Sequence, residues 1–93
     1  MTYSILIVDD DIAIKESVEE YLKLLNYTVK SDSNADDALK TLESFDADVV
    51  LTDIMMQGMD GLDLTKKIKG LYDIDVMVMT GYSADYSYEE AIN

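Results

Sequence analysis

Three aspartates stand at the ends of apolar runs in this sequence, where their side chains could act together. Asp9 and Asp10 follow the near-continuous apolar run 3–8, and Asp53 follows the run 48–52. The carboxyl ends of parallel strands line the crevice in which open α/β sheets bind ligands. Because the first and third runs are expected to be neighbours in one sheet, the three carboxylates are predicted to converge.

A cluster of three carboxylates needs a source of positive charge. Two like charges about 4 Å apart repel by roughly 4 kcal/mol at an effective dielectric constant of about 20. Protonation, a lysine or a cation would relieve this repulsion. A divalent ion with oxygen ligands is the simplest solution, and Mg²⁺ fits a few carboxylates plus waters. The alternative is structural: Asp9, Asp10 and Asp11 cap a helix, and Asp53 forms a turn.

Composition limits the kinds of site and partner that are available. The 93 residues allow one small domain, and their net charge of −13 argues against direct contact with nucleic acid or anionic lipid. Without cysteine or histidine there is no disulfide, no thiolate or imidazole metal site and no Ser-His-Asp triad. No apolar stretch approaches the roughly 18 residues of a membrane span, and no signal peptide opens the chain. We therefore expect a soluble, cytoplasmic domain.

Four apolar runs alternate with three segments of helical periodicity. The runs lie at 3–8, 27–29, 48–52 and 76–79. Runs that are apolar on both faces are typical of parallel strands covered by helices on both sides. This order predicts an α/β fold with a doubly wound parallel sheet.

The three predicted helices have recognisable ends and apolar faces. Asp11 and Asn34 are predicted N-caps, and Asn26 a left-handed residue at the end of the first helix. The first helix carries one apolar stripe, which consists of Ile14, Val18, Tyr21, Leu22 and Leu25. The third is expected to direct Leu64, Ile68 and Leu71 inward and to end near Gly70.

Three motifs, taken together, make the sequence similar to the receiver domains of response regulators. They are Ile5-Leu-Ile-Val-Asp9-Asp10-Asp11, Asp53-Ile-Met-Met-Gln-Gly-Met-Asp60-Gly61 and Met79-Thr80-Gly81-Tyr82. They occur in the family's order, and the resemblance extends from residue 3 to residue 93. It implies a flavodoxin-like receiver topology with strand order 2-1-3-4.

The resemblance also implies a role for individual residues. Asp53 corresponds to the phosphoacceptor, which takes a phosphoryl group from a sensor histidine kinase or a phosphotransfer protein. Asp10 corresponds to a direct Mg²⁺ ligand and Asp9 to one acting largely through water, while Asp53 and the backbone carbonyl of Met55 also contact the ion. Thr80 corresponds to the switch hydroxyl, which turns toward the phosphoryl group. We therefore expect a phosphoacceptor that switches conformation for an output partner. We do not expect a turnover enzyme, and at most we expect slow, Mg²⁺-assisted loss of its own phosphoryl group.

The sequence departs from the family pattern in two respects. Gln57 stands where the family usually has proline. The family also continues with a fifth strand, a lysine at the tip of that strand and a fifth helix, and none of the seven lysines present here replaces that lysine. We therefore expect residues 1–93 to form a single truncated receiver domain, with impaired phosphorylation of Asp53. We also expect self-association through the exposed fourth strand or the uncovered face of the first helix.

Two other classes of function remain open at this stage. In a haloacid-dehalogenase-like phosphatase, the D-x-D opening would make Asp9 the nucleophile and Asp11 the acid, but the motif that begins at Asp53 would have no explanation. A receiver-fold interaction module without phosphorylation would keep the fold and lose the metal site. Covalent phosphate on Asp9 would favour the phosphatase, and absence of Mg²⁺ binding would favour the module.

Overall fold

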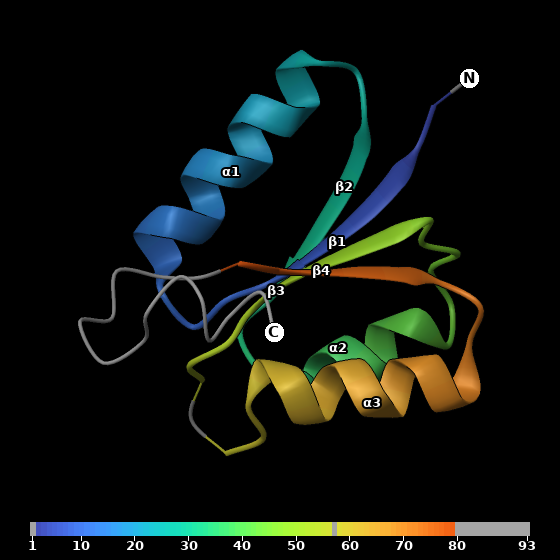
Figure 1. Ribbon diagram of the computed structural model, residues 1–93. Helices are drawn as coiled ribbons and strands as arrows, with labels where there is room; N and C mark the ends of the chain where they lie inside the picture. Colours follow the sequence, from blue (N-terminus) through green and yellow to red (C-terminus); the bar gives the residue numbers. More distant parts are fainter. Residues whose placement is uncertain (1, 57, 80–93) are drawn as a thin grey trace.

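The computed structural model describes residues 2–56 and 58–79. This part of the chain forms a four-stranded sheet with helices on both faces (Figure 1). In chain order the elements are β1 (Ser4–Val8), α1 (Ile12–Leu24), β2 (Thr28–Asp32), α2 (Ala35–Leu42), β3 (Val49–Asp53), α3 (Gly61–Leu71) and β4 (Asp75–Met79). All neighbouring strands are parallel and the order is β2-β1-β3-β4, which confirms the predicted fold class.

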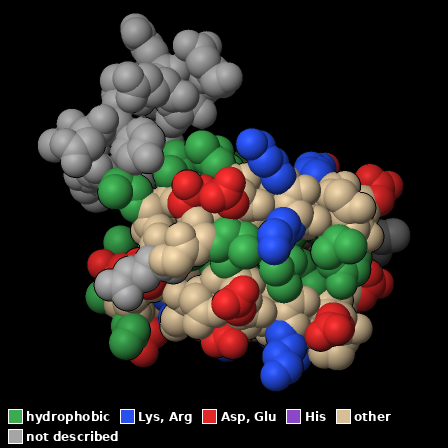
Figure 2. All heavy atoms as spheres, turned by 90° about the horizontal axis from the view of Figure 1, so that it is seen from below, with side chains coloured by type: hydrophobic (Ala, Val, Ile, Leu, Met, Phe, Trp, Pro, Cys, Tyr) green, Lys and Arg blue, Asp and Glu red, His purple; other side chains and the backbone are tan. Residues whose placement is uncertain are grey.

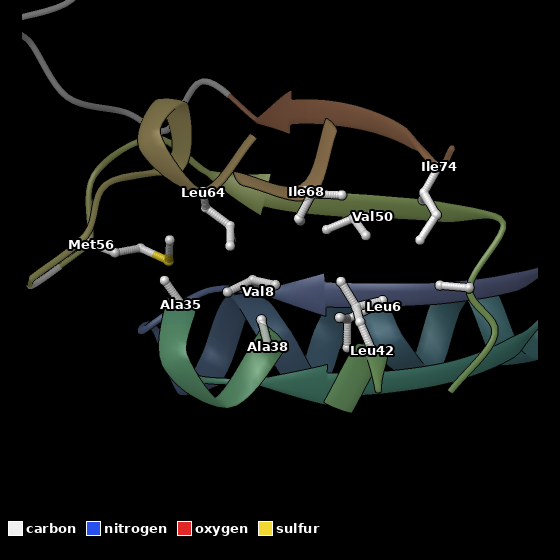
Figure 3. Packing of buried hydrophobic residues seen from close by; sticks show 11 residues of the cluster. Leu6, Val8, Ala35, Ala38, Leu42, Val50, Met56, Leu64, Ile68 and Ile74 are labelled. Atoms are coloured by element: carbon white, nitrogen blue, oxygen red, sulfur yellow. The ribbon is translucent and has the colours of Figure 1, made fainter. Parts of the chain in front are cut away.

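The larger core lies between the sheet and the helices α2 and α3, which share one face (Figures 1 and 3). Leu6, Val8 and Val50 point from the strands into this core. The helices contribute five fully or almost fully buried side chains, Ala35, Ala38, Leu42, Leu64 and Ile68. Burying the larger of these side chains, Leu42, Leu64 and Ile68, stabilises the fold by about 1.5–3 kcal/mol each relative to exposure.

The opposite face is covered by α1 alone among the described residues, and only in part. Helix α1 packs along β2 and β1, over a small cluster of Ile5, Ile7 and Val29. Ile7 of β1 is fully buried, its neighbour Leu51 in β3 is partly buried, and Met77 of β4 is 60% exposed. The half of this face formed by β3 and β4 is therefore open in the described structure.

The apolar stripe predicted for α1 is consequently not a buried stripe. No residue of α1 is buried, and Tyr21 is 62% exposed. Only Val18 and Leu22 pack against the small cluster. Ile14 and Leu25 of the stripe are exposed as well, so only part of the stripe is covered in the described structure.

The helix ends follow local chemistry closely. The Asp11 carboxylate accepts hydrogen bonds from the peptide N–H groups of Ala13 and Ile14, and Asn26 has a φ of 69°. Helix α3 ends at Leu71, next to the predicted Gly70, but the inward direction predicted for Leu71 was wrong, because its side chain is 69% exposed. Tyr72 and Ile74, which follow as the chain turns toward β4, fill the core at this end instead.

No helix in the described ranges has the length and apolarity needed to cross a membrane.

Figure 2 shows the molecule from the side of α2 and α3. Acidic side chains and lysines are scattered over this face, with apolar side chains between them. The view contains no extended basic surface, as the net charge of −13 leads one to expect.

Candidate metal centre

The carboxyl edge of the sheet brings three acidic side chains together. Asp9 follows β1 directly and Asp53 is the last residue of β3, and these strands are neighbours, with Val8 opposite Thr52. Carboxylate oxygens of Asp9, Asp10 and Asp53 all lie within 4.8 Å of one another. The convergence predicted from the sequence is therefore observed.

The three carboxylates differ in exposure and in how they are held. Asp9 is 2% exposed, Asp53 is half-buried and Asp10 is exposed, so the cluster opens from the protein interior to the surface. The Asp11 N–H donates to Asp9 Oδ1 at 2.9 Å, and the Met55 N–H donates to Asp53 Oδ1 at 3.4 Å. Backbone donors on the two flanking loops thus orient the two more buried carboxylates.

Burial and mutual repulsion make the cluster hard to ionise. Desolvation raises the pKa of Asp9, and the charges of Asp53 and Asp10 raise it further, against the lowering effect of the Asp11 N–H. Desolvation also raises the pKa of Asp53, against the N–H groups of Met55 and Ile54, and the charges of Asp10 and Asp11 add to the rise. A cation placed among these groups would favour their charged forms.

The donor set fits the metal that the family resemblance implies. All three side chains offer carboxylate oxygens, which suit Mg²⁺, Ca²⁺ and Mn²⁺ rather than the softer transition metals. One buried and two more accessible carboxylates leave room for solvent, and Mg²⁺ usually keeps several waters when bound to protein. The residues present are therefore able to hold a divalent cation.

The loop after β3 and the start of α3 fix the backbone of Asp53. The Gly61 N–H donates to the Ile54 carbonyl at 2.9 Å. A Cβ atom on Gly61 would lie 2.1 Å from the Asp53 carbonyl oxygen, so only glycine allows this approach. Met56 is buried in the larger core, and Asp60 caps α3 by accepting from the Asp63 N–H at 2.8 Å. Gly61 enters the sequence prediction only as the last residue of the motif that begins at Asp53, and its packing against the Asp53 backbone was not predicted.

Two of the predicted site residues, Thr80 and Met55, are not placed at the cluster by the structure. Thr80 lies outside the described residues. Gln57, where the family usually has proline, lies outside them as well. Met55 has an exposed side chain and contributes its N–H to Asp53, while contact of its carbonyl with a metal stays a prediction. The two ion pairs in the described ranges, Lys23–Glu19 and Lys69–Asp75, do not involve the acidic cluster.

Comparison with known proteins establishes the class to which this fold and site belong. Residues 5–93 match the response regulator receiver domain family, and the chain belongs to that family. It is 38% identical over 81 residues to the regulatory protein VanR of Enterococcus faecium, an alignment that covers 87% of this chain and 35% of VanR. It is 37% identical over 86 residues to the heme response regulator HssR of Staphylococcus saprophyticus, covering 92% of this chain and 38% of HssR. The chain thus spans little more than a third of the length of these relatives.

Solved structures show the same fold. The N-terminal domain of a receiver protein from Methanoculleus marisnigri has a TM-score of 0.86 and 32% identity, over 99% of this chain and 76% of that chain. A crystal structure of the histidine kinase ThkA in complex with the response regulator TrrA contains a chain with a TM-score of 0.82 and 32% identity, over 98% of this chain and 79% of that chain. Membership of the receiver family favours the receiver interpretation over the phosphatase alternative.

Proposed function

We propose that Asp53 of this receiver domain accepts a phosphoryl group from a histidine kinase or a phosphotransfer protein. The observation that carries the proposal is the convergence of Asp9, Asp10 and Asp53 within 4.8 Å. A carboxylate oxygen of Asp53 attacks the phosphorus of a phosphohistidine; the O–P bond forms, the P–N bond breaks, and the electron pair stays on the imidazole nitrogen. The product is an aspartyl phosphate.

Different residues of the chain are proposed to orient the nucleophile, to bind the metal and to respond to the phosphoryl group. The Met55 N–H holds one oxygen of Asp53, which leaves the carboxylate oriented for attack. Asp9 and Asp10 are the proposed Mg²⁺ ligands together with Asp53. When bound, Mg²⁺ supplies charge neutralisation and positioning for the phosphoryl oxygens. Thr80 is the proposed switch hydroxyl, whose movement toward the phosphoryl group would alter the surface presented to an output partner.

Three further features support this proposal. The similarity to a chain in the ThkA–TrrA complex supports a histidine kinase as partner. The net charge of −13 supports a protein partner rather than direct binding of nucleic acid. A stoichiometric phosphoacceptor, rather than a turnover enzyme, fits a cluster that has no paired lysine among the described residues, in a chain without histidine. A cytoplasmic location fits a kinase-coupled switch.

The test is labelling of the chain with acetyl phosphate in the presence and absence of Mg²⁺, followed by mass spectrometry of peptides. We expect Mg²⁺-dependent phosphate on Asp53, which Asp53→Asn abolishes and Asp10→Asn strongly reduces. Asp36→Asn, which neutralises an exposed acid on α2, is the matched control and should label normally. Phosphate on Asp9 would support the phosphatase alternative, and absence of both label and Mg²⁺ binding would support the interaction module.

A second proposal concerns the open half of the sheet. We propose that a second copy of this chain packs on this open half, at Met77 of β4 and at the apolar side chains Tyr21 and Leu25 of α1, all of which are exposed. Exposed apolar side chains on an uncovered face can mark an interaction site, and an edge strand such as β4 in the described sheet also offers backbone groups. The charge of −13 on each copy opposes the contact, so the association is expected to strengthen as salt screens that charge.

A further inference from the structure

Asp11 joins the acidic cluster to the first helix. Its peptide N–H donates to Asp9 Oδ1 at 2.9 Å. Its own Oδ1 accepts from the N–H groups of Ala13 and Ile14 at 3.0 and 3.2 Å, which begins α1. One residue therefore orients a carboxylate of the cluster with its backbone and fixes a helix end with its side chain.

Asp11 lies beside the cluster although its side chain is not among the converging oxygens. The three oxygens that lie within 4.8 Å of one another come from Asp9, Asp10 and Asp53. Asp11 directly follows Asp10 in the chain and its N–H contacts the Asp9 carboxylate, so its own charge lies close to the cluster. The first turn of α1 contains no acidic residue, so within this end of the helix the Asp11 cap supplies the negative charge.

We propose that Asp11 is a positioning residue of the metal centre that strengthens divalent cation binding from outside the ligand set. Its N–H holds Asp9, and its carboxylate adds a fourth negative charge to the field at the cation. The inference rests on the proposed Mg²⁺-binding function. A purely structural role would make the side chain a helix cap and nothing else.

Two substitutions separate the charge of Asp11 from its capping ability. Asn is as good an N-cap as Asp, so Asp11→Asn removes the charge and keeps the cap. Glu keeps the charge, but it is not among the preferred N-cap residues, so Asp11→Glu weakens the cap. Both leave the peptide N–H that donates to Asp9 in place. Asp36→Asn again serves as the control for loss of one exposed acid elsewhere.

The measurement is a titration of the 93-residue chain with MgCl₂, followed by amide chemical shifts, with thermal unfolding recorded in EDTA. We expect Asp11→Asn to weaken Mg²⁺ binding about three- to tenfold at low salt, the size expected for losing one nearby charge in a largely aqueous setting. Its unfolding temperature in EDTA should stay within a few degrees of the parent. Asp11→Glu should bind within about twofold of the parent, and the Asp11→Asn difference should shrink near 0.5 M salt.

Distinct outcomes overturn the inference and the function beneath it. If Asp11→Asn binds Mg²⁺ as the parent does while Asp11→Glu loses affinity, the side chain acts only as a cap. If both variants bind like the parent, the charge has no role. If the parent itself binds no Mg²⁺, the proposed metal centre fails and this inference fails with it.

Discussion

Asp9 and Asp53 are residues whose burial opposes their charge, and this has a definite consequence for stability. Their pKa values are raised from 3.8 by desolvation first and by neighbouring acids second. The folded state therefore binds protons more readily than the unfolded state just above pH 3.8. Stability contributed by these groups falls as pH rises from 3.8 through the raised pKa. Glu19 acts in the opposite sense, because its hydrogen bond with Lys23 lowers its pKa below 4.5 and its contribution is lost on acidification.

Asp53→Asn should accordingly stabilise the metal-free chain. We expect the free energy of unfolding at pH 7 to rise by roughly 0.5–2 kcal/mol, a range that allows for solvent screening of a half-buried group. The gain should shrink toward pH 4, where the parent carboxylate takes up its proton. Urea denaturation in EDTA at both pH values measures this, with Asp36→Asn as control. Destabilisation by Asp53→Asn at pH 7 would show that the carboxylate is favourably held without a cation.

Added Mg²⁺ should stabilise the parent chain at neutral pH. At a free Mg²⁺ concentration about ten times the dissociation constant, linkage predicts a gain of about 1.4 kcal/mol. Asp10→Asn should lose most of this gain, because it removes one of the three converging carboxylates. Thermal unfolding at increasing MgCl₂ measures the effect. An equal gain in the parent and in Asp10→Asn would indicate non-specific screening rather than a site.

The start of helix α3 packs directly against the end of β3, because Gly61 lies against the Asp53 backbone. A Cβ on Gly61 would meet Asp53 O at 2.1 Å, whereas one on Gly70 of the same helix would meet nothing within 4 Å. We expect Gly61→Ala to destabilise the chain by about 1–3 kcal/mol through overpacking. It should also weaken Mg²⁺ binding, because the Asp53 backbone must shift. Gly70→Ala should be stabilising by about 0.5–1 kcal/mol.

Unfolding in urea and a MgCl₂ titration of both glycine variants test this coupling. The matched pair separates the close contact from the helix propensity that alanine brings to either position. Equal behaviour of Gly61→Ala and Gly70→Ala in both measurements would mean that the loop relaxes without disturbing the site.

The sequence was sufficient where local chemistry decides the structure. Asp11 and Asn34 were predictable caps because their side chains bond peptide N–H groups two or three residues away. The meeting of Asp9, Asp10 and Asp53 was predictable because parallel strands place their carboxyl ends at one edge.

The sequence was insufficient where distant parts of the chain decide the structure. The prediction for the second strand, 27–29, was too short, because Lys30, Ser31 and Asp32 are polar yet continue the ladder beside β1. These residues form a strand because they pair with Leu6 to Val8, and their own amino-acid types do not predict a strand. Gly61 likewise owes its importance to a backbone eight residues earlier.

At the scale of the whole molecule, the two faces of the sheet are unequal in the described structure. On the side of α2 and α3, Ile68 is fully buried in the larger core. On the side of α1, burial declines from Ile7 to Leu51 to Met77 across one row of the sheet. We expect Ile68→Ala to cost about 2–5 kcal/mol in a urea denaturation experiment, and Met77→Ala much less than 2 kcal/mol. Similar costs at both positions would mean that Met77 is buried in solution.

Met77→Lys tests the proposed contact between copies. Met77 is 60% exposed and central in β4, so a lysine there should leave the fold intact while placing a charge on the open half of the sheet. Sedimentation velocity at micromolar concentration should show association of the parent that increases with salt, and its loss in Met77→Lys. Leu71→Lys is the control, because Leu71 is 69% exposed on the helix covering the other face. A parent chain that stays monomeric at high salt would refute the contact. Loss of association in both variants would also refute the contact, because the two positions share the added charge but not their location.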